Sequence, residues 1–366
     1  MTEQIRVLVV DDSAFLRKVV SQMLARSPAI TVVGTARDGE DALDQVARLE
    51  PDVVTLDLVM PRMNGVEFLR AQGARRPLPV VICSIAHESG AMALEAFEAG
   101  AVEFVQKPTA LATDRVYEIA DELVAKVEAA FRARRPAVAA WDRVPAEAAV
   151  AGSSPAPAPA PASRRIPGRG TVRPSGRVRT DVIVLGISTG GPQALRELIP
   201  RFAADFPVPI VMVLHMPVGY TEMYARRLDD ISALEVREAQ EGDALQPGVA
   251  LLAPAGMHLT FVRGADGVRI HLDLEPLDAQ HRPSVDVLFR SAADVLGGRV
   301  LGVVMTGMGS DGLLGAAHVK AQGGRIVTEA ESSCVVYGMP RAVAEASLSD
   351  RVATLDEMAD AIGELA

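Results

Sequence analysis

The sequence is poor in the features that mark nucleic-acid-binding, membrane-embedded and disulfide-stabilised proteins. Lys and Arg number 37 against 47 Asp and Glu, and the formal net charge of -10 argues against general binding to nucleic acid or anionic membranes. No apolar run approaches the roughly 20 residues that a membrane-spanning helix needs. The two cysteines, Cys83 and Cys334, lie in different halves without metal or disulfide spacing. We therefore expect a soluble, cytoplasmic protein without direct membrane insertion.

The N-terminus lacks the pattern of a secretion signal. Residues 1–10 contain a short apolar run without a basic flank or a small-residue cleavage site, and this run leads directly into Asp11-Asp12. We interpret it as a strand. Hydrophobic residues make up 49% of the 366 residues, which is enough for two ordinary cores, so two domains are expected.

A change of composition separates the two expected domains. Pro and Ala alternate over residues 154–162, and arginines are scattered over the residues that follow, so this region has no periodic apolar face to bury. We assign residues 1–128 to a first domain, 129–179 to a flexible linker and 180–366 to a second domain. The linker arginines could bind an acidic partner, but a solvated tether is the simpler explanation.

The first domain alternates short apolar strands with amphipathic helices, which is typical of a doubly wound parallel sheet. The expected strands are Ile5–Val10, Thr31–Ala36, Val53–Asp57, Val80–Ser84 and Glu103–Gln106. The carboxyl ends of parallel strands meet at one edge of the sheet, so the polar residues that end them should converge there. These residues are Asp11, Asp12, Asp57, Ser84 and Lys107.

The converging groups suit phosphoryl chemistry. Three crowded carboxylates, Asp11, Asp12 and Asp57, would repel one another unless a hard cation joined them, and oxygen ligands favour Mg²⁺. Asp57 would attack a phosphoryl donor, Lys107 would pair with the anion, and Ser84 would share a hydrogen bond with it. As an alternative, Asp11 and Asp12 simply cap the first helix. The occurrence of all five residues in this order along the chain favours a phosphoacceptor site over helix capping.

Three motifs give the first domain a family resemblance. Asp11-Asp12, Leu56-Asp57 followed by Met60-Pro61, and Lys107-Pro108 fall at the expected strand ends. With them, this half resembles the receiver domain of two-component response regulators, which implies a flavodoxin-like fold and Mg²⁺-dependent phosphorylation of Asp57. Asn64 departs from the Asp that is usual in that family, and a small effect on phosphorylation is expected.

The second domain repeats the arrangement of a strand followed by a reactive residue. The apolar strand Val182–Ile187 leads to Ser188 in a Gly-rich turn, Val208–Leu214 leads to His215, and Val300–Met305 leads to the loop that carries Asp311. We expect a Rossmann-like parallel sheet with these three side chains at one edge. Ser188 would attack, His215 would take its proton, and Asp311 would orient the imidazole.

Taken singly, the same residues also fit other arrangements. His215 alone fits a core histidine, and Asp311 alone fits an N-cap for a helix starting at Gly312. The run at 186–190 matches the Gly-x-Ser-x-Gly elbow of α/β-hydrolases, but there the acid precedes the histidine in the chain. A dinucleotide-binding turn would place an acidic residue where His215 stands. The three strand ends together favour the hydrolytic triad.

Six motifs carry a closer resemblance. They are Gly-Ile-Ser-Thr-Gly-Gly at 186–191, His215-Met216-Pro217, and the segments 253–259, 283–289, 305–312 and 337–340. In this set and order, residues 181–366 resemble the CheB family of chemotaxis response-regulator protein-glutamate methylesterases. The resemblance implies hydrolysis of glutamyl methyl esters, and deamidation of selected glutamines, on methyl-accepting chemotaxis receptors. It also implies the histidine kinase CheA as phosphodonor and no cofactor for ester hydrolysis.

The same resemblance assigns roles to individual residues. Ser188 would be the nucleophile, His215 the base and Asp311 the orienting acid, while the backbone amide of Met308 would help to hold the oxyanion and Thr189 would flank the nucleophile. The departures at Leu214, Ile187 and Glu329 remove no reacting group.

The sequence leaves the roles of four residues and one alternative class of function undecided. His258 and His281 have no acidic or cysteine ligand at zinc spacing, so we expect no metal there. Met308 and Met339 would line an apolar wall around the ester methyl or pack in the core. As a second function class, the C-terminal half would be a binding module under phosphorylation control, without catalysis. Methanol release from methylated receptors would separate this class from an esterase.

Overall fold

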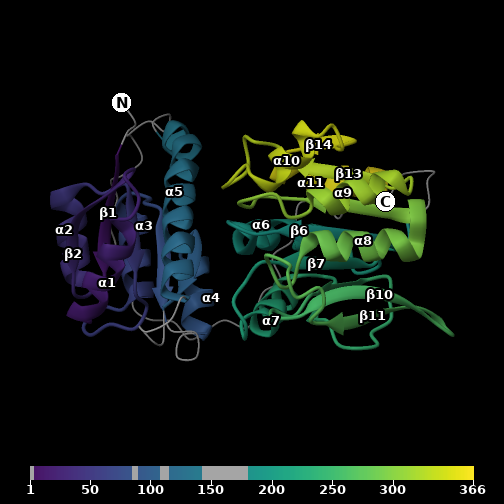
Figure 1. The fold of residues 1–366 in the computed structure, drawn as a ribbon, viewed down its shortest axis with the longest axis horizontal. Helices are drawn as coiled ribbons and strands as arrows, with labels where there is room; N and C mark the ends of the chain where they lie inside the picture. The colour runs from purple at the N-terminus through teal and green to yellow at the C-terminus, as the bar shows by residue number, and fades with distance from the viewer. Residues whose placement is uncertain (1–3, 85–89, 108–114, 142–179) are drawn as a thin grey trace, which may run out of the picture.

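The computed structural model describes residues 4–84, 90–107, 115–141 and 180–366, which form two α/β domains (Figure 1). The N-terminal domain contains β1 (Ile5–Val10), α1 (Ala14–Leu24), β2 (Ile30–Ala36), α2 (Gly39–Leu49), β3 (Val53–Leu56), α3 (Gly65–Arg75), β4 (Val80–Ser84), α4 (Gly90–Glu98), β5 (Glu103–Gln106) and α5 (Arg115–Trp141). Its strands match the predicted ranges within one residue.

The N-terminal sheet has the order β2-β1-β3-β4-β5, and every pair is parallel. The four residues of β3, Val-Val-Thr-Leu, are all buried, because helices cover both faces of the sheet. The predicted flavodoxin-like domain is confirmed.

Helix starts in this domain follow from local capping. Ser13, and not Asp11 or Asp12, is the N-cap of α1, and its hydroxyl accepts from the Leu16 amide at 3.4 Å. The capping alternative for the two aspartates is therefore wrong. Asn64 forms a capping box with Glu67 at the start of α3, with both hydrogen bonds at 2.9 Å. Asn serves here as well as Asp because the side-chain oxygen is what the cap requires.

The C-terminal domain is larger and adds a hairpin that was not predicted. Its strands are β6 (Val182–Ile187), β7 (Ile210–Leu214), β8 (Glu235–Glu238), β9 (Val249–Leu252), β10 (His258–Gly264), β11 (Gly267–Asp273), β12 (Val300–Val304), β13 (Arg325–Glu329) and β14 (Arg351–Ala353). Its helices are α6 (Gly191–Leu198), α7 (Thr221–Ile231), α8 (Val285–Leu296), α9 (Leu313–Ala321), α10 (Met339–Glu345) and α11 (Leu355–Leu365), with short 3-10 turns at Ile199–Arg201 and Gly297–Arg299.

The order of the second sheet explains where its site lies. Seven strands run β14-β13-β12-β6-β7-β9-β8, all paired in parallel, while β10 and β11 form a separate antiparallel pair. The chain leaves β6 toward β7 on one side and returns to β12 on the other. Crossovers that diverge in this way open a crevice at the carboxyl ends of the strands. The predicted doubly wound parallel sheet is confirmed.

Helix α5 continues beyond the expected domain boundary. We assigned residue 129 to the start of the linker, but α5 runs on to Trp141. The Pro-Ala run and the linker arginines fall within 142–179, outside the described residues. Among the helices of the described ranges, none combines the length and apolar character needed to cross a membrane.

The two domains meet along one face of each. In Figure 1, α4 and α5 of the N-terminal domain face the side of the C-terminal domain that carries α6 and α7. The Phe104 ring packs on Tyr220 with centroids 5.3 Å apart, and Arg196 on α6 pairs with Glu98 on α4 at 3.2 Å. This interface lies at the carboxyl edge of the second sheet.

Candidate functional site

The turn after β6 presents Ser188 at the strand's carboxyl end. All six residues of β6 are buried, and the Ser188 amide donates to Thr306 O at 2.9 Å, which ties the turn to the end of β12. Gly190 has φ 77, a conformation that glycine adopts without strain, and α6 begins at Gly191 with Pro192 in its first turn. The serine hydroxyl is thus held at the edge of the sheet on rigid backbone.

His215 follows β7, the strand next to β6. Its backbone amide donates to Ile187 O at 3.1 Å, and its Nε2 lies 2.9 Å from Asp311 Oδ2. An ionised carboxylate can only accept, so Nε2 carries a proton, and in the neutral form of the ring Nδ1 presents a lone pair. Nδ1 is buried and has no hydrogen-bond partner among the described residues.

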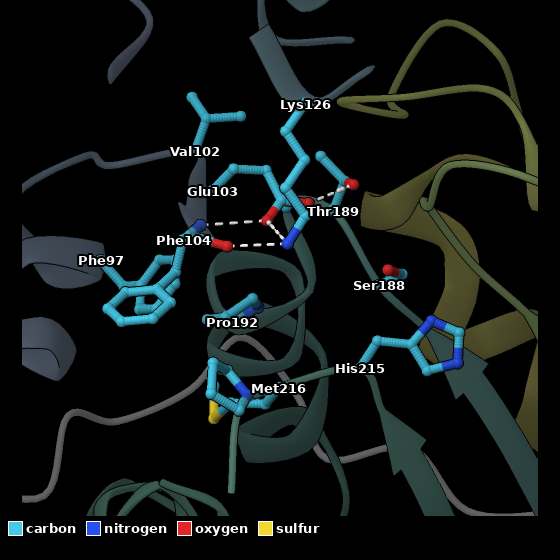
Figure 2. Close-up of a pocket in the computed structure, with 12 residues that line it drawn as sticks. Phe97, Val102, Glu103, Phe104, Lys126, Ser188, Thr189, Pro192, His215 and Met216 are labelled. Atoms are coloured by element: carbon cyan, nitrogen blue, oxygen red, sulfur yellow. Dashed lines mark hydrogen bonds and ion pairs between the residues drawn. The ribbon is translucent and has the colours of Figure 1, made fainter. Parts of the chain in front are cut away.

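Ser188 and His215 line the same pocket, and Figure 2 shows the two side chains facing it from neighbouring strand ends. Within the described residues, no hydrogen bond joins them. Catalytic hydrogen bonds often tighten only when substrate binds, so this spacing is compatible with a nucleophile and its base.

Asp311 is bound by the start of α8 as well as by His215. Its carboxylate accepts from the Ser284 hydroxyl at 2.9 Å, from the Val285 amide at 2.8 Å and from the Asp286 amide at 2.9 Å. Burial raises the pKa of Asp311, but these donors and His215 outweigh it and lower that pKa to about 2. The carboxylate therefore stays ionised at the ordinary pH of cells.

The alternative in which Asp311 is the N-cap of the following helix is wrong. Helix α9 has Gly312 as its N-cap, and its amides are bound by another aspartate: Asp286 accepts from Gly312 N at 2.9 Å and from Gly315 N at 2.6 Å. Asp311, which precedes α9, accepts from the first amides of α8, and Asp286, in α8, accepts from amides at the start of α9. These contacts fix the position of Asp311, and the sequence, in which 283–289 stood out only as a motif of the family, did not predict them.

The loop after β12 closes one wall of the site. At Gly307, an added Cβ would lie 2.8 Å from Ser188 Cβ, so only a glycine allows the loop to pass this close to the serine. Gly307 O accepts from the amides of Gly338 and Met339 at 3.1 and 2.9 Å. The next amide, that of Met308, donates to no backbone acceptor in the described part of the chain.

The N-terminal domain closes the opposite wall. Figure 2 shows Glu103 and Lys126 of that domain beside Thr189 and Ser188. The Thr189 hydroxyl donates to Glu103, whose carboxylate also pairs with Lys126 at 3.3 Å. Lys126 in addition donates to Phe104 O at 2.7 Å. In this arrangement the first domain covers the pocket that contains Ser188.

Two further histidines surround the site. The ring of His281 stacks on that of His215 with centroids 4.1 Å apart and an angle of 23° between planes. His258 accepts from the Ser284 amide at Nδ1 and donates from Nε2 to Pro276 O, both at 3.3 Å. Both nitrogens of His258 are therefore bonded, and one of them contacts the N-cap residue of α8. The sequence drew attention to His281 only as a possible metal ligand and gave no signal that it contacts His215.

The predicted phosphoacceptor residues are brought together. Ligand oxygens of Asp11, Asp12 and Asp57 lie within 4.8 Å of one another, a spacing and chemistry that fit a divalent cation. Lys107 pairs with Asp11 and with Asp57, both at 2.6 Å. Burial raises the pKa of Asp57, and the ion pair with Lys107 opposes that shift. Ser84 is buried at the end of β4, the strand next to β3.

Comparisons with known proteins find a family model for each of the two domains. The CheB methylesterase family model matches residues 183–362, and the response regulator receiver domain model matches residues 7–116. A protein-glutamate methylesterase/protein-glutamine glutaminase of Myxococcus xanthus is 50% identical over 355 residues, covering 97% of this chain and 96% of its own. Another protein of the same name, from Symbiobacterium thermophilum, is 46% identical and covers 98% of this chain and 96% of its own length.

A solved structure resembles the second domain. The crystal structure of the Thermotoga maritima CheB methylesterase catalytic domain superposes with a TM-score of 0.50 at 39% identity, covering 52% of this chain and 100% of that chain. Because two relatives match over almost their full lengths, the chain belongs to the CheB family of methylesterases with an N-terminal response regulator receiver domain.

Proposed function

We propose that Ser188, His215 and Asp311 are the catalytic triad of this protein-glutamate methylesterase/protein-glutamine glutaminase. The observation that carries the proposal is the pairing of His215 Nε2 with the ionised Asp311, in the pocket that contains Ser188. The substrates would be glutamyl methyl esters and selected glutamines on chemotaxis receptors. Demethylation of receptors serves sensory adaptation.

The tautomer of His215 determines the course of acylation. Nε2 is protonated by its contact with Asp311, so Nδ1 takes the proton of the Ser188 hydroxyl as the oxygen bonds to the ester carbon. Nδ1 then returns this proton to the departing methoxide as the carbon–oxygen bond breaks, and methanol leaves. For a glutamine substrate, the same proton goes to the amide nitrogen as the carbon–nitrogen bond breaks, and ammonia leaves.

Deacylation repeats these steps with water. Nδ1 takes a proton from water as its oxygen bonds to the acyl carbon, and the proton returns to Ser188 as the acyl bond breaks. During each step His215 is an imidazolium, which the Asp311 carboxylate stabilises. The carboxylate is already ionised and bound by the start of α8, so it needs no rearrangement when this charge appears.

The oxyanion would be held by the loop after β12. Gly307 brings this loop against Ser188, and within the described residues the Met308 amide has no backbone acceptor, as an oxyanion donor requires. Thr189 flanks the nucleophile, but its hydroxyl donates to Glu103 in this state. Binding of a bulky receptor helix therefore requires the N-terminal domain to move.

Phosphorylation would supply the signal for that movement. A histidine kinase, which we propose to be CheA, would transfer a phosphoryl group to Asp57. Asp11, Asp12 and Asp57 would hold Mg²⁺, which would neutralise charge on the phosphoryl oxygens, and Lys107 would pair with the phosphate. The added charge of about -1.5 to -2 would shift the balance between closed and open domain arrangements.

The two free cysteines are buried and fit a reducing compartment, and we propose that the protein acts in the cytoplasm.

Methanol release from membranes that contain methylated chemoreceptors tests the activity. The full chain should release methanol, and release should rise when a small phosphodonor and Mg²⁺ are added. Phosphodonor-dependent binding to the membranes without methanol release would instead identify a binding module.

A further inference from the structure

We infer that His281 is a positioning residue for the catalytic base, because its ring stacks against His215 and limits rotation of the imidazole out of the Asp311 hydrogen bond. This inference rests on the proposed roles of Ser188 and His215. It adds to the triad a restraint on the ring plane that the carboxylate alone does not provide.

His215 needs a second restraint. The terminal torsion of histidine is broad, and rotation about it changes which nitrogen faces the serine. Asp311 bonds to one ring nitrogen, and the other nitrogen has no hydrogen-bond partner in the described ranges. A single hydrogen bond fixes one atom of a ring and leaves its plane free to tilt about that bond. The stacked ring of His281, with planes 23° apart, opposes this tilt.

His281 is itself held by the segment that binds Asp311. The next residue, Arg282, accepts from the Gly256 amide at 3.0 Å, and its guanidinium donates to Leu277 O at 3.2 Å. Three residues after His281, Ser284 caps α8 and donates its hydroxyl to Asp311. One short segment therefore sets both the ring that packs on His215 and the helix end that orients its carboxylate.

The charge state of His281 suits this role. The groups in electrostatic contact with it are His215 and Asp311, and Lys126 and Glu122 from α5 of the other domain. Burial lowers the pKa of His281 to about 4, with His215 and Lys126 acting in the same direction. At neutral pH the ring is uncharged, and it does not repel the imidazolium that forms on His215 during catalysis.

Two substitutions separate stacking from other roles of His281. His281→Phe keeps a flat ring and removes both nitrogens, whereas His281→Ala removes the ring. His271→Ala is the matched control, since His271 is a half-exposed histidine on β11 that bonds to Glu241. For each full-length variant, kcat and KM are measured in methanol release, and thermal unfolding is followed separately. Ser188→Ala is assayed in the same way for comparison.

We expect His281→Ala to lower kcat about 10- to 100-fold with little change in KM, as misplacement of a catalytic group does. His281→Phe should restore kcat to within about 3-fold of wild type, and His271→Ala should match wild type. Equal kcat for His281→Ala and wild type would overturn the inference, as would a phenylalanine variant as slow as the alanine variant. A loss explained by unfolding alone would also overturn it. Methanol release by Ser188→Ala at the wild-type rate would instead overturn the proposed triad.

Discussion

The Thr189 hydroxyl donates a hydrogen bond to Glu103, so the receiver domain is bonded to the residue that follows Ser188. Glu103 begins β5, and Lys107, which pairs with Asp57, follows the end of the same strand. One short strand therefore connects the phosphoacceptor site with the covered pocket. A shift of β5 on phosphorylation would act on Thr189 directly.

Weakening this contact should raise the unphosphorylated rate. Glu103→Ala removes the acceptor, and one hydrogen bond to a charged group contributes about 1.5–3 kcal/mol. If the domain contact keeps the enzyme closed, methanol release without phosphodonor should rise about 10-fold or more. Glu103→Gln, which keeps an acceptor oxygen, should raise it less. An alanine variant with an unchanged or lower rate would show that the contact does not hold the closed state.

The phosphoacceptor site makes a separate prediction. Asp57→Asn should release methanol at the same rate with and without phosphodonor, because the amide cannot form the acyl phosphate. Removal of divalent cations with EDTA should likewise abolish the response of the wild-type enzyme. Asp44→Asn, a change of an exposed aspartate on α2, is the control and should respond normally. Equal stimulation of Asp57→Asn and wild type would place the phosphoacceptor elsewhere.

Acid should destabilise the wild type through Asp311. Its folded-state pKa of about 2 lies below the ordinary 3.8, so folding favours the ionised form. The resulting stability, about 2 kcal/mol, is present above about pH 4 and is lost as the pH falls through about 2. Asp311→Asn has no such group, so its free energy of unfolding should fall less steeply between pH 5 and 2.5. Urea unfolding across this range checks the difference, and parallel curves would contradict it.

Gly307 offers a test of the oxyanion wall. An added Cβ would meet Ser188 Cβ at 2.8 Å and also the Met339 sulfur, so Gly307→Ala must displace the loop that carries the Met308 amide. We expect kcat to fall about 100-fold with a smaller change in KM, because the loss is in the transition state. Gly73→Ala is the control, since no atom of the described residues lies within 4 Å of its added Cβ. A Gly307→Ala enzyme with wild-type kcat would argue against an oxyanion donor in this loop.

The parts of the site that the sequence predicted are those fixed by local pattern. The apolar runs of β6, β7 and β12 end where Ser188, His215 and the Asp311 loop begin, and parallel pairing brings these ends together. The apolar strand pattern was therefore sufficient to place Ser188, His215 and the Asp311 loop on one edge.

The parts it did not predict depend on contacts between distant segments. The hydrogen bonds from the start of α8 to Asp311 and from the start of α9 to Asp286 arise because α8 and α9 pack side by side, and no spacing in the chain records this. The stacking of His281 on His215 and the bond from Thr189 to Glu103 have the same origin. Helix α5 exceeded its expected end because alanine and arginine, both strong helix formers, continue the helix where the apolar period fades.

The most direct test of the triad is the kcat of methanol release by full-length Ser188→Ala on methylated receptor membranes, compared with the wild type under the same phosphodonor conditions. Our account predicts a fall of about 10³-fold or more, since loss of a nucleophile leaves only binding and oxyanion stabilisation. A folded Ser188→Ala enzyme that keeps most of the wild-type rate would contradict the central claim.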